Sequence, residues 1–417
     1  MRLLILTQYF PPEVGAPQTR LFAMTAELKR LGHEVEVVTA MPNYPKGRIF
    51  PHYRGSFYRR EKKDGVVVHR VWLHAAMGGG FRRMLNYLSY SVTSLYGLLK
   101  AKSPDYVFVE SPPLLLVITG WLGAIAWRAP LILNVADLWP ESAVEMGFLK
   151  DGILVRLLVA LENWGYRRAT VVNAMTEGIR DSLVRKKGIP PAKVLFLPNG
   201  VDTILYQPRP IDIILKEKLG LSGKKIILYQ GTQGHAHGLE SVLEAARLLG
   251  NNPEIHFLFM GDGSERARLA KLQRQLGLRN VTFRDPVSVE QLPPYFSIAE
   301  CGLASLRDIP LMEGARPAKM FPILASGKPL IFVGRGEGAQ LVEQAKAGIV
   351  VRPGDPEALA AAVRNLIADP ELLRQLGANG RAFVETNMQW SKLVGEWIAC
   401  LGQVHAPGTP ALNALRS

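Results

Sequence analysis

A strand, a glycine-bearing turn and an amphipathic helix open the chain at 1–31, and the same three-part pattern begins again near Ile226. In the first copy, MRLLIL leads through PPEVGAP into a helix in which Leu21, Met24 and Leu28 recur at helical spacing. In the second copy, KKIILYQ leads through GTQGHAHG into LESVLEAARLLG, and a further strand follows each helix. The repeat predicts two doubly wound α/β domains, each with its ligands beyond the carboxyl ends of parallel strands.

The alternation of strand and helix patterns places the domain boundaries. We expect a first domain at 1–204, to which a last helix at 388–404 returns, and a second domain at 205–387. A proline-containing connector is expected at about 203–222, where the alternation stops. The tail at 405–417 is rich in Pro and Gly and is expected to be mobile.

The chain carries 50 Lys and Arg against 36 Asp and Glu, a formal charge of +14, which favours acidic partners such as phosphate ligands or anionic lipid. The charge is spread over many helices and forms no basic tail, so we expect no nucleic-acid role. We interpret the basic segment as a solvated loop and strand face, which includes Arg54, Arg59, Arg60, Lys62 and Lys63.

The two cysteines are far apart and match no metal-binding or disulfide pattern. We therefore expect a cytoplasmic location.

Two apolar segments raise the question of a membrane. The run at 112–127 is short for a membrane-spanning helix and contains Pro and Gly, so we expect a buried helix of the first domain. The segment 81–102 has a broad apolar face, interleaved aromatics and basic ends. It fits either a core helix with charged ends or a helix lying in the interface of an anionic membrane, as a peripheral contact.

Glycines and charged residues follow several of the predicted strands, where the ligand site of such a fold is expected. Neither copy contains GxGxxG or a Walker lysine, so the dinucleotide and ATP motifs are absent. The glycines and acids after the predicted strands can be explained without a ligand. The glycines permit tight turns, and Asp137 and Asp262 suit turns or helix caps. Lys319, beside a helix start, would complement a diphosphate. Because no Asp-x-Asp pair occurs, we expect no metal and no cofactor.

Five ordered segments resemble a known family along nearly the whole chain: YFPPEVGAPQTR, GHEVEVVTAMPNYPKG, SPPLLLVITG with NVADLWPESAVEMG, LPNGVD and PAKMFPILASGKP. They are similar to family-4 (GT4) glycosyltransferases of the WbuB/WcaI-like group. The resemblance implies a GT-B fold with an interdomain cleft. It also implies metal-independent transfer, with retained anomeric configuration, from a nucleotide sugar on the second domain. The donor is often a UDP-linked N-acetylated or deoxy hexose. The implied acceptor is a glycan or lipid-linked glycan at the cytoplasmic membrane in bacterial surface polysaccharide assembly.

The resemblance also implies site residues. The expected donor-binding residues are Gly15, Gly231, Thr232, Gly234, Gly261, Asp262, Gly263, Arg316, Lys319, Met320 and Phe321. Arg20, Asp137 and Glu141 are expected on the acceptor side, and Asp137 and Lys319 are the expected catalytic residues.

Two departures from the family pattern affect the donor side. The glycine loop reads GTQGHAHGL, with His235 and His237 in place of the usual Arg and Lys. Pro322 occupies the position of the glutamate that the family uses on ribose. We therefore expect Lys319, Arg316 and backbone N–H groups to bind the diphosphate.

Two other functions share this architecture. A nucleotide-sugar 2-epimerase would need carboxylates and His around the sugar, and would change a UDP-sugar without any acceptor. A non-catalytic partner subunit, which Pro322 makes plausible, would bind nucleotide weakly and turn nothing over.

Overall fold

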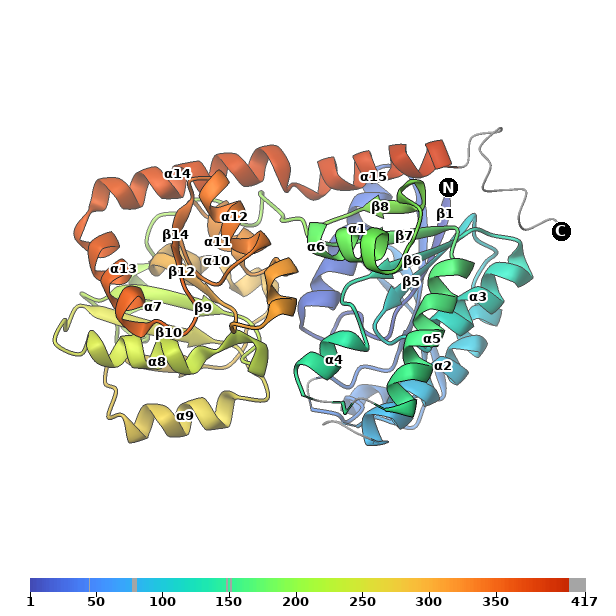
Figure 1. The fold of residues 1–417 in the computed structure, drawn as a ribbon, viewed down its shortest axis with the longest axis horizontal. Helices are drawn as coiled ribbons and strands as arrows, with labels where there is room; N and C mark the ends of the chain where they lie inside the picture. The colour runs from blue at the N-terminus through green and yellow to red at the C-terminus, as the bar shows by residue number, and fades with distance from the viewer. Residues whose placement is uncertain (45, 77–80, 148, 151, 405–417) are drawn as a thin grey trace. The chain divides into compact units, whose positions relative to one another are not determined.

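The computed structural model describes residues 1–404 apart from 45, 77–80, 148 and 151, and leaves the side chain of Phe81 undescribed. The chain divides into two compact units (Figure 1). The first consists of Met1–Asn199 with the chain from Trp390 onward, and the second of Gly200–Gln389. The divisions were expected at 204/205 and 387/388. The tail expected to be mobile, 405–417, lies outside the described residues.

The first unit is built on one sheet of eight strands. In spatial order β3-β4-β2-β1-β5-β6-β7-β8, all neighbours are parallel except β3 and β4. The strands are β1 (Arg2–Leu6), β2 (Glu34–Ala40), β3 (Tyr58–Lys63), β4 (Val66–Val71), β5 (Tyr106–Ser111), β6 (Leu131–Val135), β7 (Val171–Ala174) and β8 (Val194–Phe196). Alternate residues of β1 serve the two faces, with Leu3 and Ile5 in one core and Leu4 and Leu6 in the other.

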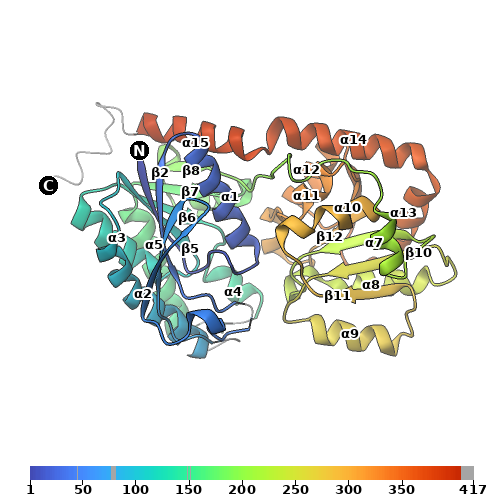
Figure 2. The ribbon, with the colours of Figure 1, turned by 180° about the vertical axis from the view of Figure 1, so that it is seen from behind.

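Helices cover both faces of this sheet (Figure 2). On one face, α1 (Ala16–Arg30) and α15 (Trp390–Val404) pack over Leu3 and Ile5. The other face is covered by α2 (Phe81–Lys100), α3 (Leu116–Trp127) and α5 (Ile153–Arg168). Shorter helices are α4 (Glu141–Glu145) and α6 (Glu177–Asp181). The expected doubly wound arrangement is therefore confirmed for this unit.

The second unit has a six-stranded, all-parallel sheet in the order β11-β10-β9-β12-β13-β14. The strands are β9 (Lys225–Gln230), β10 (Ile255–Met260), β11 (Val281–Arg284), β12 (Ala299–Ser305), β13 (Leu330–Val333) and β14 (Gly348–Val351). One face is covered by α8 (Leu239–Leu248), α9 (Arg266–Gln275) and α13 (Pro356–Ala368). The other face is covered by α7 (Ile213–Lys218), α10 (Pro293–Ile298), α11 (Met320–Ala325), α12 (Glu337–Gln344) and α14 (Pro370–Asn387).

The basic segment forms a turn at Arg54 and then β3, an edge strand antiparallel to β4, which agrees with the expected loop and strand face. Two other segments differ from what the sequence predicts. The expected connector contains α7, which Asp212 caps by accepting from the Leu215 N–H. The helix within 112–127 is buried on one side only, because Ile118, Leu122 and Ile125 are exposed. In the part of the chain that the structure describes, no helix combines the length and apolarity needed to cross a membrane.

Candidate functional site

The loops after β9 and β10 pack backbone against backbone at the carboxyl edge of the second sheet. The N–H of Gln233 donates to the carbonyl of Asp262 at 2.8 Å. Gly261 (φ 140°) and Gly263 (φ 157°) lie against Gly231 and Gln233, and a Cβ on either would fall less than 3.0 Å from a carbonyl oxygen of that loop. Contact between the two loops therefore already requires glycine at 261 and 263, without any ligand.

Other predicted residues of these loops remain accessible. Thr232 and Asp262 are exposed, and a Cβ on Gly234 would meet nothing closer than 3.6 Å. The Asp262 carboxylate accepts from the N–H of Gly263 at 2.8 Å, so it braces its own turn. Space for a ligand is thus left at Gly234, whereas Asp262 has a structural role.

Lys319 directly precedes α11, and its amine lies over the end of β9. Its Nζ donates to the Tyr229 hydroxyl at 2.6 Å and lies 4.4 Å from the centre of the same ring. Burial lowers the pKa of Lys319 to about 7. Among the described residues, no Asp or Glu oxygen lies within ion-pair distance of this amine. The site therefore holds a cation whose counter-charge the described protein does not supply.

His237, in the short 3₁₀ helix η4 (His235–His237), completes this cluster from the glycine loop. Its Nδ1 lies 3.1 Å from the carbonyl of Ser305 and acts as the donor, since a carbonyl can only accept. The Ser305 hydroxyl donates in turn to the His237 carbonyl at 2.7 Å. Burial and the nearby Lys319 lower the pKa of His237 to about 3. The neutral ring thus turns the acceptor Nε2 toward Lys319 Nζ, 3.5 Å away.

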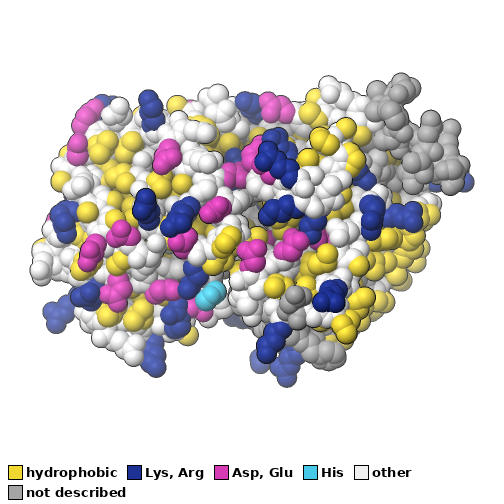
Figure 3. Space-filling view, in the orientation of Figure 1, with side chains coloured by type: hydrophobic (Ala, Val, Ile, Leu, Met, Phe, Trp, Pro, Cys, Tyr) yellow, Lys and Arg dark blue, Asp and Glu magenta, His cyan; other side chains and the backbone are white. Residues whose placement is uncertain are grey.

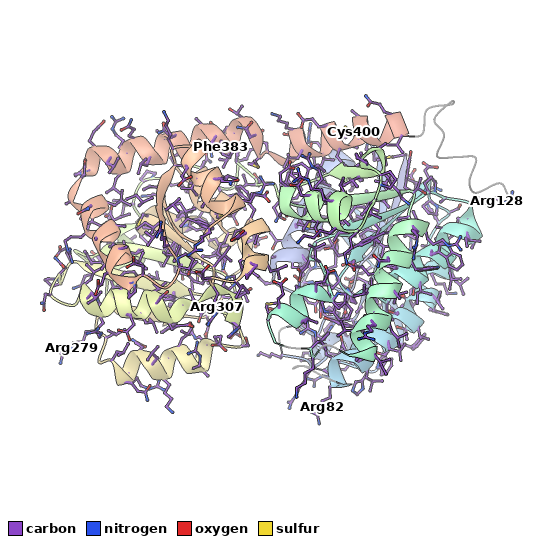
Figure 4. The ribbon with its side chains drawn as sticks, viewed as in Figure 1. Arg82, Arg128, Arg279, Arg307, Phe383 and Cys400 are labelled. Carbon is purple, nitrogen blue, oxygen red and sulfur yellow. The ribbon has the colours of Figure 1, made fainter. Side chains whose placement is uncertain are left out.

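Two arginines near the cluster already have acidic partners. Arg307, labelled in Figure 4, pairs with Glu240 and donates through Nε to the His235 carbonyl at 3.0 Å, which fastens the glycine loop. Arg316, expected on the diphosphate, lies 3.3 Å from Glu337, and its side chain is only 9% exposed. Lys319 therefore differs from both arginines in its lack of a carboxylate partner among the described residues.

Two of the three residues that begin α11 are core residues. The side chains of Met320 and Phe321, expected at the donor, are fully buried in the hydrophobic core, and their N–H groups donate to the carbonyls of Pro317 and Ala318. The structure thus places both away from any ligand surface. Pro322 lies in the first turn of α11, where a missing N–H costs no helical hydrogen bond.

In the first unit, Arg20 is part of a buried polar chain. It pairs with Glu110 at the end of β5, and both side chains are almost fully buried. Glu110 also accepts from the Asn134 amide at 2.8 Å. Arg20, expected on the acceptor side, thus neutralises a buried carboxylate. Gly15, just before α1, leaves room for Gln18, whose Oε1 would lie less than 3.0 Å from a Cβ there.

Asp137 and Glu141 follow β6 at the carboxyl edge of the same sheet. The Asp137 carboxylate is partly buried and accepts from the Ser142 hydroxyl at 2.8 Å. Burial raises the pKa of Asp137 above its ordinary value. Glu141, with its side chain 40% exposed, pairs with Lys187, which also donates to Glu162 at 2.7 Å. Both predicted acids thus lie at the expected edge, and each keeps an accessible part.

Two further residues of interest were not predicted from the sequence. Glu13 is buried in the loop after β1 and accepts from the N–H groups of Asn43 and Tyr44 at 2.8 and 2.7 Å. Burial raises the pKa of Glu13 to about 7. A single acid inside the apolar stretch YFPPEVGAP was the available clue. Tyr229, the partner of Lys319, looks like an ordinary strand residue in the sequence, so no sequence pattern indicated its role.

The described residues contain no group of three or more His, Cys, Asp or Glu side chains that could hold a metal ion. The strongest ligand site that the geometry offers is therefore an anion site at Lys319. Lys319 lies against Gly231, whose loop leads to the open position at Gly234, and near the start of the ten-residue helix α8, whose backbone N–H groups favour negative charge.

Two family models match the chain, one on each unit. The model described as glycosyl transferase 4-like domain matches residues 15–200, and the one described as glycosyl transferases group 1 matches residues 212–383. A putative colanic acid biosynthesis glycosyl transferase, WcaI of Escherichia coli (strain K12), is 28% identical over 89% of this chain and 93% of its own. The probable glycosyltransferase WbjE of Pseudomonas aeruginosa is 26% identical over 72% and 75%.

Solved structures show the same fold at low sequence identity. A sucrose-phosphate synthase from Thermosynechococcus elongatus has a TM-score of 0.76 and 18% identity, covering 97% of this chain and 99% of its own. Anabaena HepE in complex with UDP-glucose has a TM-score of 0.73 and 16% identity, with 97% and 100% coverage. The expected GT-B fold is thereby confirmed.

Proposed function

Because the chain belongs to the glycosyltransferases that combine a glycosyl transferase 4-like domain with a group 1 domain, we propose that it moves a sugar from a UDP-sugar, with retention of configuration. The proposed acceptor is a lipid-linked glycan at the cytoplasmic face of a bacterial membrane, in surface polysaccharide assembly. The named activities of WcaI and WbjE support the transferase reaction, and the colanic acid role of WcaI supports the polysaccharide.

The observation that carries this proposal is the amine of Lys319. A buried cation without a carboxylate partner among the described residues is costly, and a diphosphate would supply the missing charge. The bound dianion would in turn favour the charged amine and raise the pKa of Lys319 from about 7. The proposed donor site is therefore on the second unit, with the diphosphate at Lys319 and at the glycine loop that runs from Gly231 to the open backbone at Gly234.

The proposed chemistry uses charge at the leaving group. The bond between the anomeric carbon and the diphosphate oxygen breaks as a bond to the acceptor hydroxyl forms on the same face of the sugar. The hydroxyl proton passes to the departing diphosphate, while Lys319 and backbone N–H groups stabilise the negative charge that develops there. Asp137 and Glu141 of the first unit are proposed to orient the acceptor hydroxyls through their accessible oxygens.

Thermal unfolding in the presence of UDP-, GDP- and TDP-sugars tests the donor class, because a ligand that binds only the folded state raises its stability. We expect a UDP-sugar to give the largest rise in Tm. One relative at 26% identity is a GDP-mannose-dependent mannosyltransferase of Mycolicibacterium smegmatis, so GDP-mannose is the informative competitor. Release of UDP only when a glycan acceptor is added would support transfer. Formation of an epimer without acceptor would contradict it.

A further inference from the structure

Three helices of the first unit form one continuous layer on the sheet. The Thr119 hydroxyl of α3 donates to the Ser91 carbonyl of α2 at 2.8 Å. Trp121 of α3 and Trp164 of α5 meet edge to face, with ring centres 5.1 Å apart. The inner sides of α2, α3 and α5 belong to the hydrophobic core. Their outer sides therefore make up one face of this unit, which we call the three-helix face.

The three-helix face is apolar. Of the twenty large hydrophobic side chains that are exposed within the described residues, eleven lie on these three helices, which is too many for random scatter. Leu99 is 82% exposed, Ile153 77% and Leu157 63%. Figure 3 shows hydrophobic side chains gathered over α3 and α5. The full set is Leu88, Val92, Leu95, Tyr96, Leu99, Ile118, Leu122, Ile125, Ile153, Leu154 and Leu157.

The charges of this face have a single sign. The basic residues of the three helices are Arg82, Arg83, Lys100, Arg156, Arg167 and Arg168, and Arg128 follows α3 directly. Arg82 and Arg128 lie at opposite ends of the layer (Figure 4). Glu162 is the single acid in these helices, and it is buried and accepts from Lys187 at 2.7 Å. An apolar surface whose helices expose basic side chains and no acid complements a bilayer with anionic headgroups. Pairing with a second copy would bring like charges together.

Aromatic residues continue the face beside α2. Phe57 and Trp72 are exposed, and Phe57 meets the Tyr96 ring edge to face at 5.5 Å. Lys100 lies over the same Tyr96 ring, 5.2 Å from its centre. Aromatic rings and long basic side chains are the groups that prefer the boundary between lipid tails and headgroups. They give this edge of the three-helix face the composition of an interfacial anchor.

We propose that the three-helix face docks the protein on the surface of an anionic lipid bilayer, with α2, α3 and α5 lying in the interface. The biological reason for docking rests on the proposed function, because a lipid-linked acceptor would lie in that bilayer. The evidence for docking comes from the surface itself. The helix α3 begins five residues after the carboxyl end of β5, so docking holds the edge that carries Asp137 close to the membrane. The membrane interface considered for the segment 81–102 thus extends over a whole face.

Vesicle co-sedimentation of the full chain, without nucleotide sugar, tests the docking. The face variant replaces one exposed residue on each helix: Leu99→Gln, Ile125→Gln and Leu157→Gln. The matched control makes the same change at Ile211, Ile213 and Ile214, exposed residues of the second unit in and just before α7. We expect the wild type and the control to bind phosphatidylglycerol-containing vesicles. Binding of the face variant should be at least about tenfold weaker, because three apolar insertions are lost.

The possible results separate the docking from the proposed function. Transfer to a short, water-soluble acceptor should be the same for the face variant and the wild type, since none of the changed residues belongs to the proposed donor or acceptor site. Equal vesicle binding by the face variant and the wild type would overturn the docking, as would a wild type that binds no vesicles. A wild-type dimer that the face variant converts to monomer would assign the face to a second copy instead. Vesicle binding without any sugar transfer would leave the docking intact and reject the proposed reaction.

Discussion

Arg20 of the first unit and Lys319 of the second are both buried cations, but their charges are balanced differently. In the first, Arg20 and Glu110 neutralise each other within a chain of polar side chains, and Lys187 joins Glu141 to Glu162. In the second, the described polar contacts of the Lys319 amine are the hydroxyl and ring face of Tyr229 and the neutral ring nitrogen of His237. A balanced pair stabilises the fold, whereas an unbalanced cation costs stability and is explained by a ligand that brings the opposite charge.

The same substitution in both units tests this contrast most strongly. Arg20→Met leaves the buried Glu110 without its partner and should lower the free energy of unfolding by about 3–5 kcal/mol. Lys319→Met removes a cation without a carboxylate partner and should leave stability unchanged or raise it. Urea unfolding of both variants measures the difference. Equal losses of stability would remove the distinction between the two sites.

A pair of glycine substitutions tests the loop contact in the second unit. Gly261→Ala forces a Cβ toward the carbonyl of Gly231 at positive φ and should cost about 2 kcal/mol of stability. Gly234→Ala has room in the protein and should cost less than about 1 kcal/mol. If the diphosphate lies against the backbone at Gly234, Gly234→Ala should instead weaken donor binding. Thermal unfolding and donor titration of both variants provide the readout, and reversed effects would contradict the assignment of free space to Gly234.

Donor binding should depend on pH through Lys319. Burial lowers the pKa of Lys319 to about 7, so the empty site loses its positive charge as the pH rises above that value. Affinity for the preferred UDP-sugar should be greatest below pH 7 and should fall by up to about tenfold per pH unit above it. His237 contributes no titration there, because its pKa is lowered to about 3. Calorimetric titrations across this range measure the effect, and Lys319→Met should give a flat profile. A flat profile in the wild type, or an unchanged pH dependence in Lys319→Met, would contradict the prediction.

The smallest expected effect concerns the orientation of Lys319. His237→Phe removes the acceptor Nε2 that faces the amine, as well as the bond to Ser305. We expect donor affinity to fall severalfold, equivalent to about 0.5–1.5 kcal/mol. His237→Asn, which keeps an acceptor, should recover part of the loss. An unchanged affinity in both variants would show that His237 only fills space.

The sequence predicted the regular elements well because their apolar periodicity is local. The strands at 106–111, 255–260 and 281–284 have the predicted bounds. The edge strand β3 has the sequence YRREKK and no apolar alternation, and it is held by its pairing with β4 and by the packing of Tyr58 against the core and the Tyr96 ring. The short helix α7 follows Pro208 and Pro210 directly and begins at its Asp212 cap.

The partners of the site residues could not be predicted, because they depend on contacts far apart in the chain. Arg20 meets Glu110 because β1 and β5 are neighbours in the sheet. Lys319 meets Tyr229 across ninety positions, where α11 begins beside the end of β9. The sequence shows that Arg316 and Lys319 are basic residues just before a predicted helix. Only the structure shows that Glu337 already pairs with Arg316.

The central claim, that Lys319 holds the diphosphate of the donor, is tested most directly by titrating the preferred UDP-sugar into two variants. Lys328 is the matched control, since burial also lowers its pKa, while its amine donates to the Ser297 carbonyl. Lys319→Met should weaken donor binding by about tenfold to 100-fold, the value of a hydrogen bond to a charged group, and Lys328→Met should leave it unchanged. Equal affinity of Lys319→Met and the wild type would contradict the claim.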